Sequence, residues 1–368
     1  WNEVNRKGRI IPPNATFFDE TLRDGLQNPS VKDPGIERKL EILHLIEDLG
    51  IHMADIGLPG SSKRAYDDCL RMCQEVVSCK MNLRIAFAGR TVVSDITPMI
   101  DISQKVGIPI EAYAFIGSSP IRQYAEQWDL DLLVKRSCEA VDVAVKNGLT
   151  VAYVTEDTTR SRPEVLSTLF RAAIDHGATR LCLSDTVGHA TPDGVRNLVQ
   201  FTKSVVASAG AHVGIDWHGH NDRGFALENA IWALEFGADR VHATGLGIGE
   251  RVGNAQMELL LLNMKLLGQI QDQDLTKLLS YCETVARAVG WQVPINYPLV
   301  GRDAFRTATG VHAAAIIKAM AKGDTWLADH QLSLAQPNMQ MISLAMSMVT
   351  AQWAVWAIAR DERGQALW

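Results

Sequence analysis

The chain has 368 residues, 47% of them hydrophobic and 21% charged, which is typical of a globular protein and excludes a disordered one. Its 36 basic and 42 acidic residues give a formal net charge of −6, so we expect neither a nucleic acid nor an anionic membrane surface as a partner. Six irregularly spaced cysteines favour reduced thiols and a cytoplasmic location over the disulfide framework of a small secreted domain. No signal peptide is recognisable, and Trp1 in place of Met indicates a processed or excised chain.

Short β-rich runs alternate with amphipathic stretches through the first two thirds of the chain. They predict strands over residues 16–18, 52–57, 83–88, 111–116, 150–154, 180–183, 214–217 and 240–243. Helical spacing of apolar residues predicts a helix over 35–49, and Thr191 followed by Pro192 marks the start of another. Eight strands, each followed by a helix, predict an α/β fold, the closed (β/α)8 TIM barrel. The alternative is an open doubly wound sheet, but the sequence has no GxGxxG turn after the first strand that would support it.

The strand signal ends near residue 268. We therefore expect a TIM-barrel catalytic domain over residues 1–270 and a helical C-terminal subdomain over residues 271–368. Helices are expected over 272–289 and 301–322, joined by a linker over 292–298 that contains two prolines. Residues 331–359 carry no charge, but their many polar residues favour a buried or dimer-forming helix over a membrane span.

Polar residues follow the predicted strands at the ends where a TIM barrel builds its active site. These residues are Arg23 and Asp24 after the first strand, Glu156 after the fifth, Thr186 after the sixth, His218 and His220 at the seventh, and a glycine-rich loop ending in Asn254 after the eighth. Their convergence at one end of the barrel indicates an active site there.

His218 and His220 lie two apart on an extended segment, so both side chains point to the same face. Such a pair could simply be hydrogen-bonded at a strand end. Together with Asp24 it makes a facial set of metal ligands with open positions for substrate oxygens. The mixed nitrogen and oxygen donors suit Mg²⁺, Mn²⁺ or Zn²⁺.

Three motifs resemble the DRE-TIM metallolyases: DETLRDG at residues 19–25, HGHND at 218–222 and GIGERVGN at 247–254. The likeness is closest to the Claisen-condensing branch, which comprises 2-isopropylmalate, homocitrate and citramalate synthases, and it covers about residues 15–320. It implies that Asp24, His218 and His220 hold a divalent metal ion, with Asn254 a ligand or near-ligand.

The resemblance also implies roles for three further residues. Arg23 would steady the developing enolate oxygen, Glu156 matches the family's strand-five glutamate, and Thr186 would contact the substrate carboxylate. The chemistry agrees, because a Claisen-type condensation needs a polarised ketone, a cation beside the forming negative charge and a base for the thioester's methyl proton. The plainer interpretations are a salt bridge at the barrel mouth for Arg23, Asp24 and Glu156, a helix cap for Thr186, and a simple tight connection for the glycine-rich loop.

Beyond the barrel, Gly310-Val311-His312 resembles the Gly-x-His segment of the synthases. The resemblance implies that His312 reaches a neighbouring subunit's active site and assists proton transfer. The protein would then be a homodimer whose subdomain 271–368 contributes to dimerisation and to the site. Without the resemblance, a histidine on an apolar helix is usually structural.

Two features depart from the synthase pattern. The tail from about residue 330 leaves no room for the regulatory C-terminal domain of many synthases, so feedback inhibition there is not expected. Residues 25–28, ending in Asn28, look more like 3-hydroxy-3-methylglutaryl-CoA (HMG-CoA) lyase. That lyase has a cysteine in its strand-eight glycine loop, and the loop over 245–254 has none, which favours the synthases.

We therefore expect an acyltransferase that condenses acetyl-CoA with a 2-oxo acid, as a 2-isopropylmalate synthase does. Arg122 follows the fourth strand, where relatives carry residues that sort 2-oxo acids, and it leaves open a homocitrate synthase-like enzyme for a dicarboxylic acid. An HMG-CoA lyase-like enzyme is a further possibility, as is an inactive barrel that serves as a binding module. An inactive barrel would have lost a metal ligand, and all are present.

Overall fold

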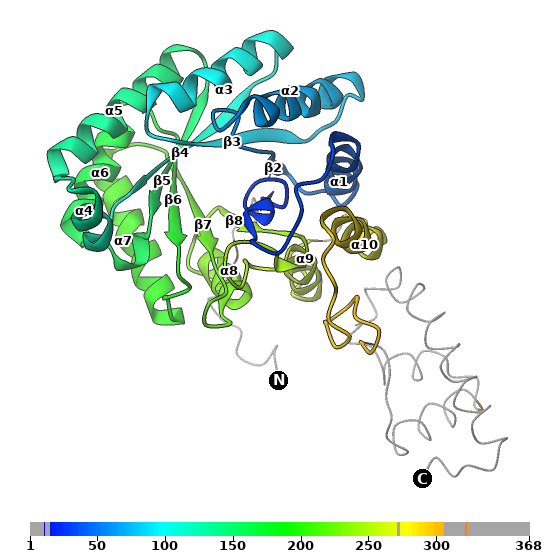
Figure 1. The fold of residues 1–368 in the computed structure, drawn as a ribbon. Helices are drawn as coiled ribbons and strands as arrows, with labels where there is room; N and C mark the ends of the chain where they lie inside the picture. Colours follow the sequence, from blue (N-terminus) through cyan, green and yellow to red (C-terminus); the bar gives the residue numbers. More distant parts are fainter. Residues whose placement is uncertain (1–10, 12–14, 271–272, 305–320, 322–368) are drawn as a thin grey trace.

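The computed structural model describes residues 11, 15–270, 273–304 and 321, and its centre is a closed barrel of eight parallel strands (Figure 1). The strands are β1 (Thr16–Asp19), β2 (Met53–Asp55), β3 (Arg84–Arg90), β4 (Ile110–Gly117), β5 (Thr150–Glu156), β6 (Arg180–Asp185), β7 (Gly214–Gly219) and β8 (Arg240–Ala243). They follow one another around the barrel in chain order, and β1 closes it by pairing with β8, Phe18 opposite His242. The predicted (β/α)8 TIM barrel is confirmed, with all eight strands within a few residues of their expected positions.

Helices surround the strands (Figure 1). They are α1 (Ile36–Asp48), α2 (Lys63–Ser78), α3 (Val93–Val106), α4 (Pro120–Glu126), α5 (Leu130–Lys146), α6 (Pro163–Asp175), α7 (Pro192–Ala209), α8 (Ala226–Glu235), α9 (Met257–Leu266) and α10 (Leu278–Val289). Three 3-10 turns, η1 (Gly25–Gln27), η2 (Thr158–Arg160) and η3 (Gly245–Gly247), lie in loops after β1, β5 and β8. Helix α7 starts as predicted, because the Thr191 side chain accepts the N–H of Gly194 and Pro192 occupies the first turn.

The helix expected over 272–289 begins later, at Leu278. The Asp274 carboxylate accepts the backbone N–H of Thr276 at 2.9 Å, which makes a turn in place of the first helical turns. Helix α10 packs beside α1 and closes the ring of helices near β1 (Figure 1). The predicted linker at 292–298 contains no helix in the structure, and most of the helix expected over 301–322 lies outside the described residues.

Two apolar layers hold the barrel together. The larger lies between the strands and the helices, where α1 contributes the fully buried Leu43 and Ile46 at helical spacing. A smaller cluster fills the barrel interior, with Phe18, Tyr113 and Cys182 among its members. Burying each large apolar side chain stabilises the fold by about 1.5–3 kcal/mol, so these two layers stabilise the barrel whose strand ends carry the predicted site residues.

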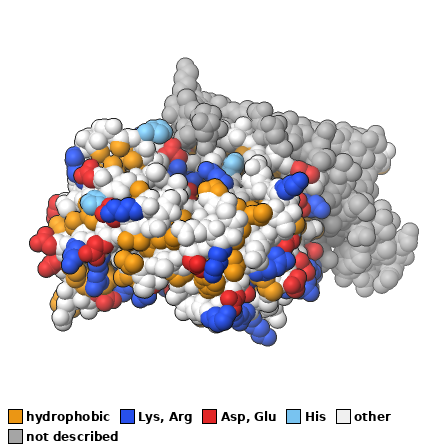
Figure 2. All heavy atoms as spheres, turned by 90° about the horizontal axis from the view of Figure 1, so that it is seen from above, with side chains coloured by type: hydrophobic (Ala, Val, Ile, Leu, Met, Phe, Trp, Pro, Cys, Tyr) orange, Lys and Arg blue, Asp and Glu red, His pale blue; other side chains and the backbone are white. Residues whose placement is uncertain are grey.

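From the composition we expect a surface of mixed charge, reduced cysteines and no membrane span. Figure 2 shows Lys and Arg interspersed with Asp and Glu on the face in view. All six cysteines are free thiols. Within the described ranges, no helix is both long and apolar enough to cross a membrane. Residues 331–359 lie outside those ranges.

Candidate active site

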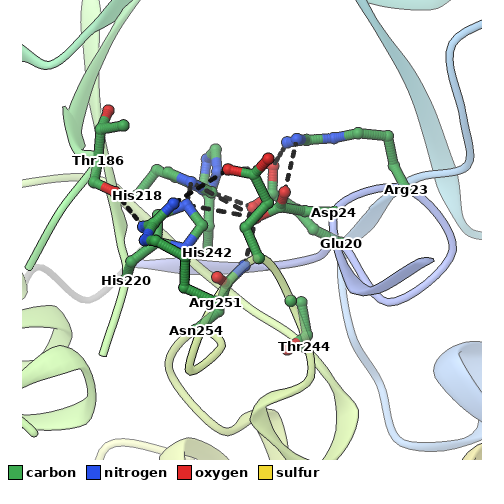
Figure 3. Close-up of polar contacts among 12 residues, drawn as sticks. Glu20, Arg23, Asp24, Thr186, His218, His220, His242, Thr244, Arg251 and Asn254 are labelled. Carbon is green, nitrogen blue, oxygen red and sulfur yellow. Dashed lines mark hydrogen bonds and ion pairs between the residues drawn. The ribbon is translucent and has the colours of Figure 1, made fainter. Parts of the chain in front are cut away.

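Asp24, His218 and His220 point toward one another at the carboxyl ends of β1 and β7 (Figure 3). The Nε2 atoms of the two histidines are 3.2 Å apart, and each lies 3.7 Å from Oδ2 of Asp24. All three side chains are about nine-tenths buried or more. One carboxylate oxygen and two imidazole nitrogens thus surround a common point, as the ligands of a metal ion do.

The backbone explains how these three side chains meet. His218 faces inward on β7, and the backbone N–H of His220 donates to the carbonyl of Asp185, which extends the strand direction by one residue. After β1 the chain folds into a turn in which the N–H groups of Arg23 and Gly25 both donate to the carbonyl of Glu20. That turn directs Asp24 back over the barrel toward β7.

Asn254 joins the group from the loop after β8. His220 and Asn254 pair as an isolated antiparallel bridge, and Nδ2 of Asn254 donates to Oδ2 of Asp24 at 2.5 Å. Its Oδ1 is buried with no hydrogen-bond partner. The loop needs its glycines here: a Cβ on Gly249 would lie 2.7 Å from that oxygen, and Gly253 has φ +95° with the carbonyl oxygen of Gly247 only 1.8 Å from its ideal Cβ position.

The electrostatics of the group suit cation binding. Burial raises the pKa of Asp24, but the charges of Arg23, His218 and His220 outweigh burial and lower the pKa below its usual value. Burial lowers the pKa of His220 to about 4. An ionised carboxylate and a neutral imidazole are the forms that bind a metal ion. The unpartnered Oδ1 of Asn254 beside this set adds a further oxygen donor, so the residues present fit a divalent cation.

Arg23 sits at the rim of the site among three carboxylates. Its guanidinium forms an ion pair with Glu20, donates from Nε to Oδ2 of Asp55 at 2.8 Å, and lies 3.3 Å from Oδ1 of Asp24. Burial raises the pKa of Asp55 to about 7, against the opposing charge of Arg23. The side chain of Arg23 is 15% exposed, and it lines the same cavity as Asp24.

A cavity of about 290 Å³ opens beside these residues. Its wall contains Glu20, Arg23, Asp24, Gln27, Leu58, Ala88, Tyr113, Phe115, Arg122, Val154, Glu156, Cys182, Ser184, Thr186, His218, His242 and Glu250. The structure thus brings Asp24 and His218 into one space with Arg23, Arg122, Glu156 and Thr186. A larger cavity of about 490 Å³ lies between η2, α6 and α7 and contains none of the predicted site residues.

Glu156 and Arg122 contact each other on the wall of this cavity. Nε of Arg122, on α4, lies 3.2 Å from Oε2 of Glu156 at the end of β5, and Nη1 of Arg122 lies 3.2 Å from Oε1 of Glu126. Their side chains are 42% and 31% exposed, so both reach solvent as well as the cavity. Arg122 is therefore shared between two carboxylates.

Thr186 is no cap of the following helix, since Thr191 caps α7. Its Oγ1 accepts the backbone N–H of Asp157 at 2.8 Å, and its own backbone carbonyl accepts from Arg251 in the β8 loop at 2.5 Å. These contacts tie the ends of β5 and β6 to the loop that carries Asn254. Asn28 ties the turn after β1 to the same loop, because its Nδ2 donates to the carbonyl of Gly249 at 2.7 Å.

Three predicted features lie outside the described residues. They are His312, the remainder of the Gly310-Val311-His312 segment, and the uncharged stretch 331–359. The structure therefore describes the predicted site residues in the barrel, but it does not describe His312, which is expected to complete the site.

Sequence reasoning missed Glu20 and His242. Glu20 is 1% exposed, with Oε2 2.6 Å from Nδ1 of His218, and its Oε1 lies 3.3 Å from Nδ1 of His242. Burial would raise the pKa of Glu20, but the charges of Arg23, His218 and His242 hold that pKa well below its usual value. A signal existed in β8, where Arg240 and His242 alternate with apolar residues and therefore share the inward face.

Comparison with known proteins identifies the family. The family described as HMGL-like matches residues 14–285. The chain belongs to the HMGL-like family. It is 33% identical over 310 residues to the homocitrate synthase AksA of Methanopyrus kandleri, a match that covers 84% of this chain and 74% of that protein. To the 2-isopropylmalate synthase of Methanocaldococcus jannaschii it is 31% identical over 321 residues, which are 86% of this chain but only 59% of that protein.

The solved structure of the HMG-CoA lyase of Bacillus subtilis has the same fold. Its TM-score is 0.64 at 21% identity, with 77% of this chain and 96% of that chain covered. The resemblance to the DRE-TIM metallolyases is therefore confirmed, and the chain belongs to an enzyme family whose members include relatives named as synthases.

Proposed function

We propose that this protein transfers the acetyl unit of acetyl-CoA to a 2-oxo acid and releases free CoA. The observation that carries the proposal is the convergence of Asp24, His218 and His220 on one point, beside a cavity that also contains Arg23 and Glu156. The names of the synthase relatives support the same reaction.

The proposed site divides the work among these residues. Asp24, His218 and His220, with Asn254 adjoining, would hold a divalent cation, which when bound makes the carbonyl of a 2-oxo acid more electrophilic. Thr186 lies on the cavity wall where its hydroxyl can contact the acid's carboxylate. Arg23 faces the same space and stabilises negative charge as it forms on oxygen.

Bond making starts with a proton transfer to Glu156. Its carboxylate takes a proton from the methyl group of acetyl-CoA, and the resulting carbon nucleophile adds to the keto carbon. The keto oxygen takes up a proton and becomes a hydroxyl. Water then cleaves the thioester, which leaves a 2-alkylmalate-type product and CoA. We propose that His312, by its resemblance to the Gly-x-His histidine of the synthases, assists proton transfer from the neighbouring subunit of a homodimer.

The cavity favours a 2-oxo acid with an apolar side chain, and 2-oxoisovalerate is the leading candidate. Leu58, Ala88, Phe115 and Val154 supply an apolar wall. Among the described residues of the wall, the arginines are already paired: Arg23 with three carboxylates, and Arg122 with Glu156 and Glu126. Neither is a spare cation for a second substrate carboxylate.

A dicarboxylic 2-oxo acid is the second candidate, because Arg122 lines the cavity and could exchange Glu126 for a substrate carboxylate. Arg122→Gln separates the two cases. If the natural substrate is apolar, the ratio of the kcat/KM values for 2-oxoisovalerate and 2-oxoglutarate is the same in Arg122→Gln as in the wild type. A change of about tenfold or more, equivalent to about 1.4 kcal/mol, would assign Arg122 to substrate selection.

A substrate panel tests the reaction itself. The protein receives acetyl-CoA, Mg²⁺ or Mn²⁺, and one of 2-oxoisovalerate, pyruvate, 2-oxoglutarate or oxaloacetate, and thiol release is followed. We expect one acid to stand out, 2-oxoisovalerate first. If none releases thiol while HMG-CoA is cleaved, the condensing function is wrong and the lyase function replaces it. If neither reaction occurs with the metal bound, the barrel is a binding module.

A further inference from the structure

Glu20 occupies the centre of a buried group of charged side chains behind the candidate metal ligands (Figure 3). It follows β1 directly. Its Oε2 lies 2.6 Å from Nδ1 of His218, and its Oε1 lies 3.3 Å from Nδ1 of His242 and forms the ion pair with Arg23. Both oxygens of the carboxylate are therefore engaged by groups from three different segments, β7, β8 and the turn after β1.

The contact with His218 determines which of its nitrogens is free. Glu20 forms an ion pair with Arg23, and an ionised carboxylate accepts hydrogen bonds and donates none, so we assign the proton of the 2.6 Å contact to Nδ1 of His218. In the neutral ring Nε2 then keeps its lone pair. That same Nε2 lies 3.2 Å from Nε2 of His220 and 3.7 Å from Oδ2 of Asp24. The Glu20 contact thus turns the electron pair of His218 toward the ligand group.

His242 is fixed from both sides. Its Nε2 lies 3.4 Å from Oδ2 of Asp216, opposite the Nδ1 contact with Glu20, and its ring centroid lies 4.3 Å from that of Phe18. Asp216 is held in turn by Nε of Arg180 at 2.7 Å and by the hydroxyl of Tyr113 at 2.6 Å. His242 therefore gives Glu20 a rigid support in the barrel interior.

We propose that Glu20, held in place by Arg23 and His242, positions the imidazole of His218 so that its Nε2 serves as a metal ligand. Glu20 is a positioning residue in this arrangement, and the inference rests on the metal site of the proposed function. Glu20, His218 and His242 also lie close enough to hold an ion themselves. However, Nδ1 of His218 contacts Oε2 of Glu20 directly at 2.6 Å, which is a hydrogen bond and leaves no space for an ion between these two atoms. The donors of the Asp24 group are 3.2–3.7 Å apart, so we place the ion on that side.

Loss of a carboxylate behind a ligating histidine typically weakens metal binding by about 10–100-fold. Glu20→Gln keeps the size of the side chain but removes its charge, and its amide can offer a donor where His218 needs an acceptor. We expect a loss in this range for Glu20→Gln. We expect a smaller loss in the same direction for His242→Gln, because it acts on His218 only through Glu20.

Titration of metal-free full-length protein with Co²⁺ tests the inference. Isothermal calorimetry gives the affinity, and the visible absorption of bound Co²⁺ reports the ligand geometry, which a purely structural defect would not alter. His52→Gln is the matched control, since its Nδ1 accepts the N–H of Phe17 away from the ligand group. We expect weaker binding and a changed spectrum for Glu20→Gln and neither change for His52→Gln.

Two results would overturn the inference in distinguishable ways. If Glu20→Gln binds Co²⁺ with the affinity and spectrum of the wild type while His218→Ala loses binding, Glu20 has no positioning part and the metal site stands. If His218→Ala also binds as the wild type does, the metal site of the proposed function is wrong and the inference falls with it. Circular dichroism of each variant confirms that the barrel is folded.

Discussion

Nε of Arg122 lies 3.2 Å from Oε2 of Glu156, so the cation expected to sort substrates is paired with the carboxylate expected to act as the base. Arg122 on α4 and Glu156 at the end of β5 both line the cavity. The Glu156 side chain is 31% exposed, so the pair leaves its carboxylate accessible in the cavity whose wall also contains Asp24 and His218. Variants of the two partners of Arg122 therefore separate a structural salt bridge from a chemical role.

Replacement of Glu156 by Gln removes the proposed base and keeps its size. We expect kcat to fall by about 10²–10⁴-fold, the contribution of a positioned base, with little change in KM for the 2-oxo acid. Glu126→Gln is the control, because Glu126 contacts the same arginine at 3.2 Å and is absent from the cavity wall. The measurement is thiol release. Equal losses of kcat in both variants would mean that Glu156 acts only as a salt-bridge partner of Arg122 and not as the base.

Replacement of His218 or His220 by Ala removes one of three donors from the ligand group. We expect the purified variants to lose bound metal, measured by elemental analysis, and to lose activity with it. His189→Ala is the control, since His189 lines the separate cavity near α7. Unchanged metal content in a His218→Ala, His220→Ala double variant would place the ion elsewhere.

Tyr281 on α10 connects the segment after the barrel to the site. Its hydroxyl donates to Oδ2 of Asp19 at 2.5 Å and lies 2.9 Å from Oγ1 of Thr21, which accepts the N–H of Gly245 at 2.7 Å. Tyr281→Phe leaves the buried Asp19 carboxyl without this donor. We expect the free energy of unfolding to fall by about 1–3 kcal/mol, measured by urea denaturation.

The same variant tests whether α10 supports the loop that carries Asn254. Tyr153→Phe is the control, since that buried hydroxyl contacts Oγ of Ser137 at 2.8 Å away from the loop. We expect both variants to lose stability and only Tyr281→Phe to lose activity at a temperature where both are folded. Equal activity in the two variants would show that the loop does not depend on α10.

Glu258 on α9 makes stability depend on pH. Its carboxylate accepts the N–H of Leu246 at 2.9 Å and the hydroxyl of Tyr297, and burial raises its pKa to about 7. Because the folded pKa is above the ordinary value of 4.5, the stabilising contribution of this group is complete below about pH 4.5 and is lost as the pH rises through 7. Glu258→Gln removes that dependence.

We therefore expect the stability of Glu258→Gln relative to wild type to increase between pH 4.5 and 7. The gain should be about 3 kcal/mol, because the pKa lies near 7 in the folded protein and near its ordinary value of 4.5 in the unfolded chain. Thermal unfolding at pH 5 and pH 8 measures it. Glu283→Gln, which replaces an exposed glutamate on α10, is the control. If the difference in stability between Glu258→Gln and wild type does not change with pH, burial does not raise the free energy of ionising Glu258.

The sequence by itself determined the barrel and the identity of the candidate ligands. Eight β-rich runs separated by helical periodicity leave few folds open, and the two-residue spacing of His218 and His220 places both side chains on one face of the extended segment at the end of β7. These are local properties, because the direction of a side chain depends on the pleat of its own strand.

Only the tertiary structure decided which side chains support those ligands. Glu20 meets His218 across 198 residues of chain, Tyr281 meets Asp19 across 262, and Asn254 meets Asp24 across 230. Such contacts arise when β8 pairs with β1 and closes the barrel, a step that brings the two ends of the domain together. The same closure places Glu20 between His218 and His242. The partners of a buried charge depend on this closure, whereas strand and helix periodicity depend only on neighbours in the sequence.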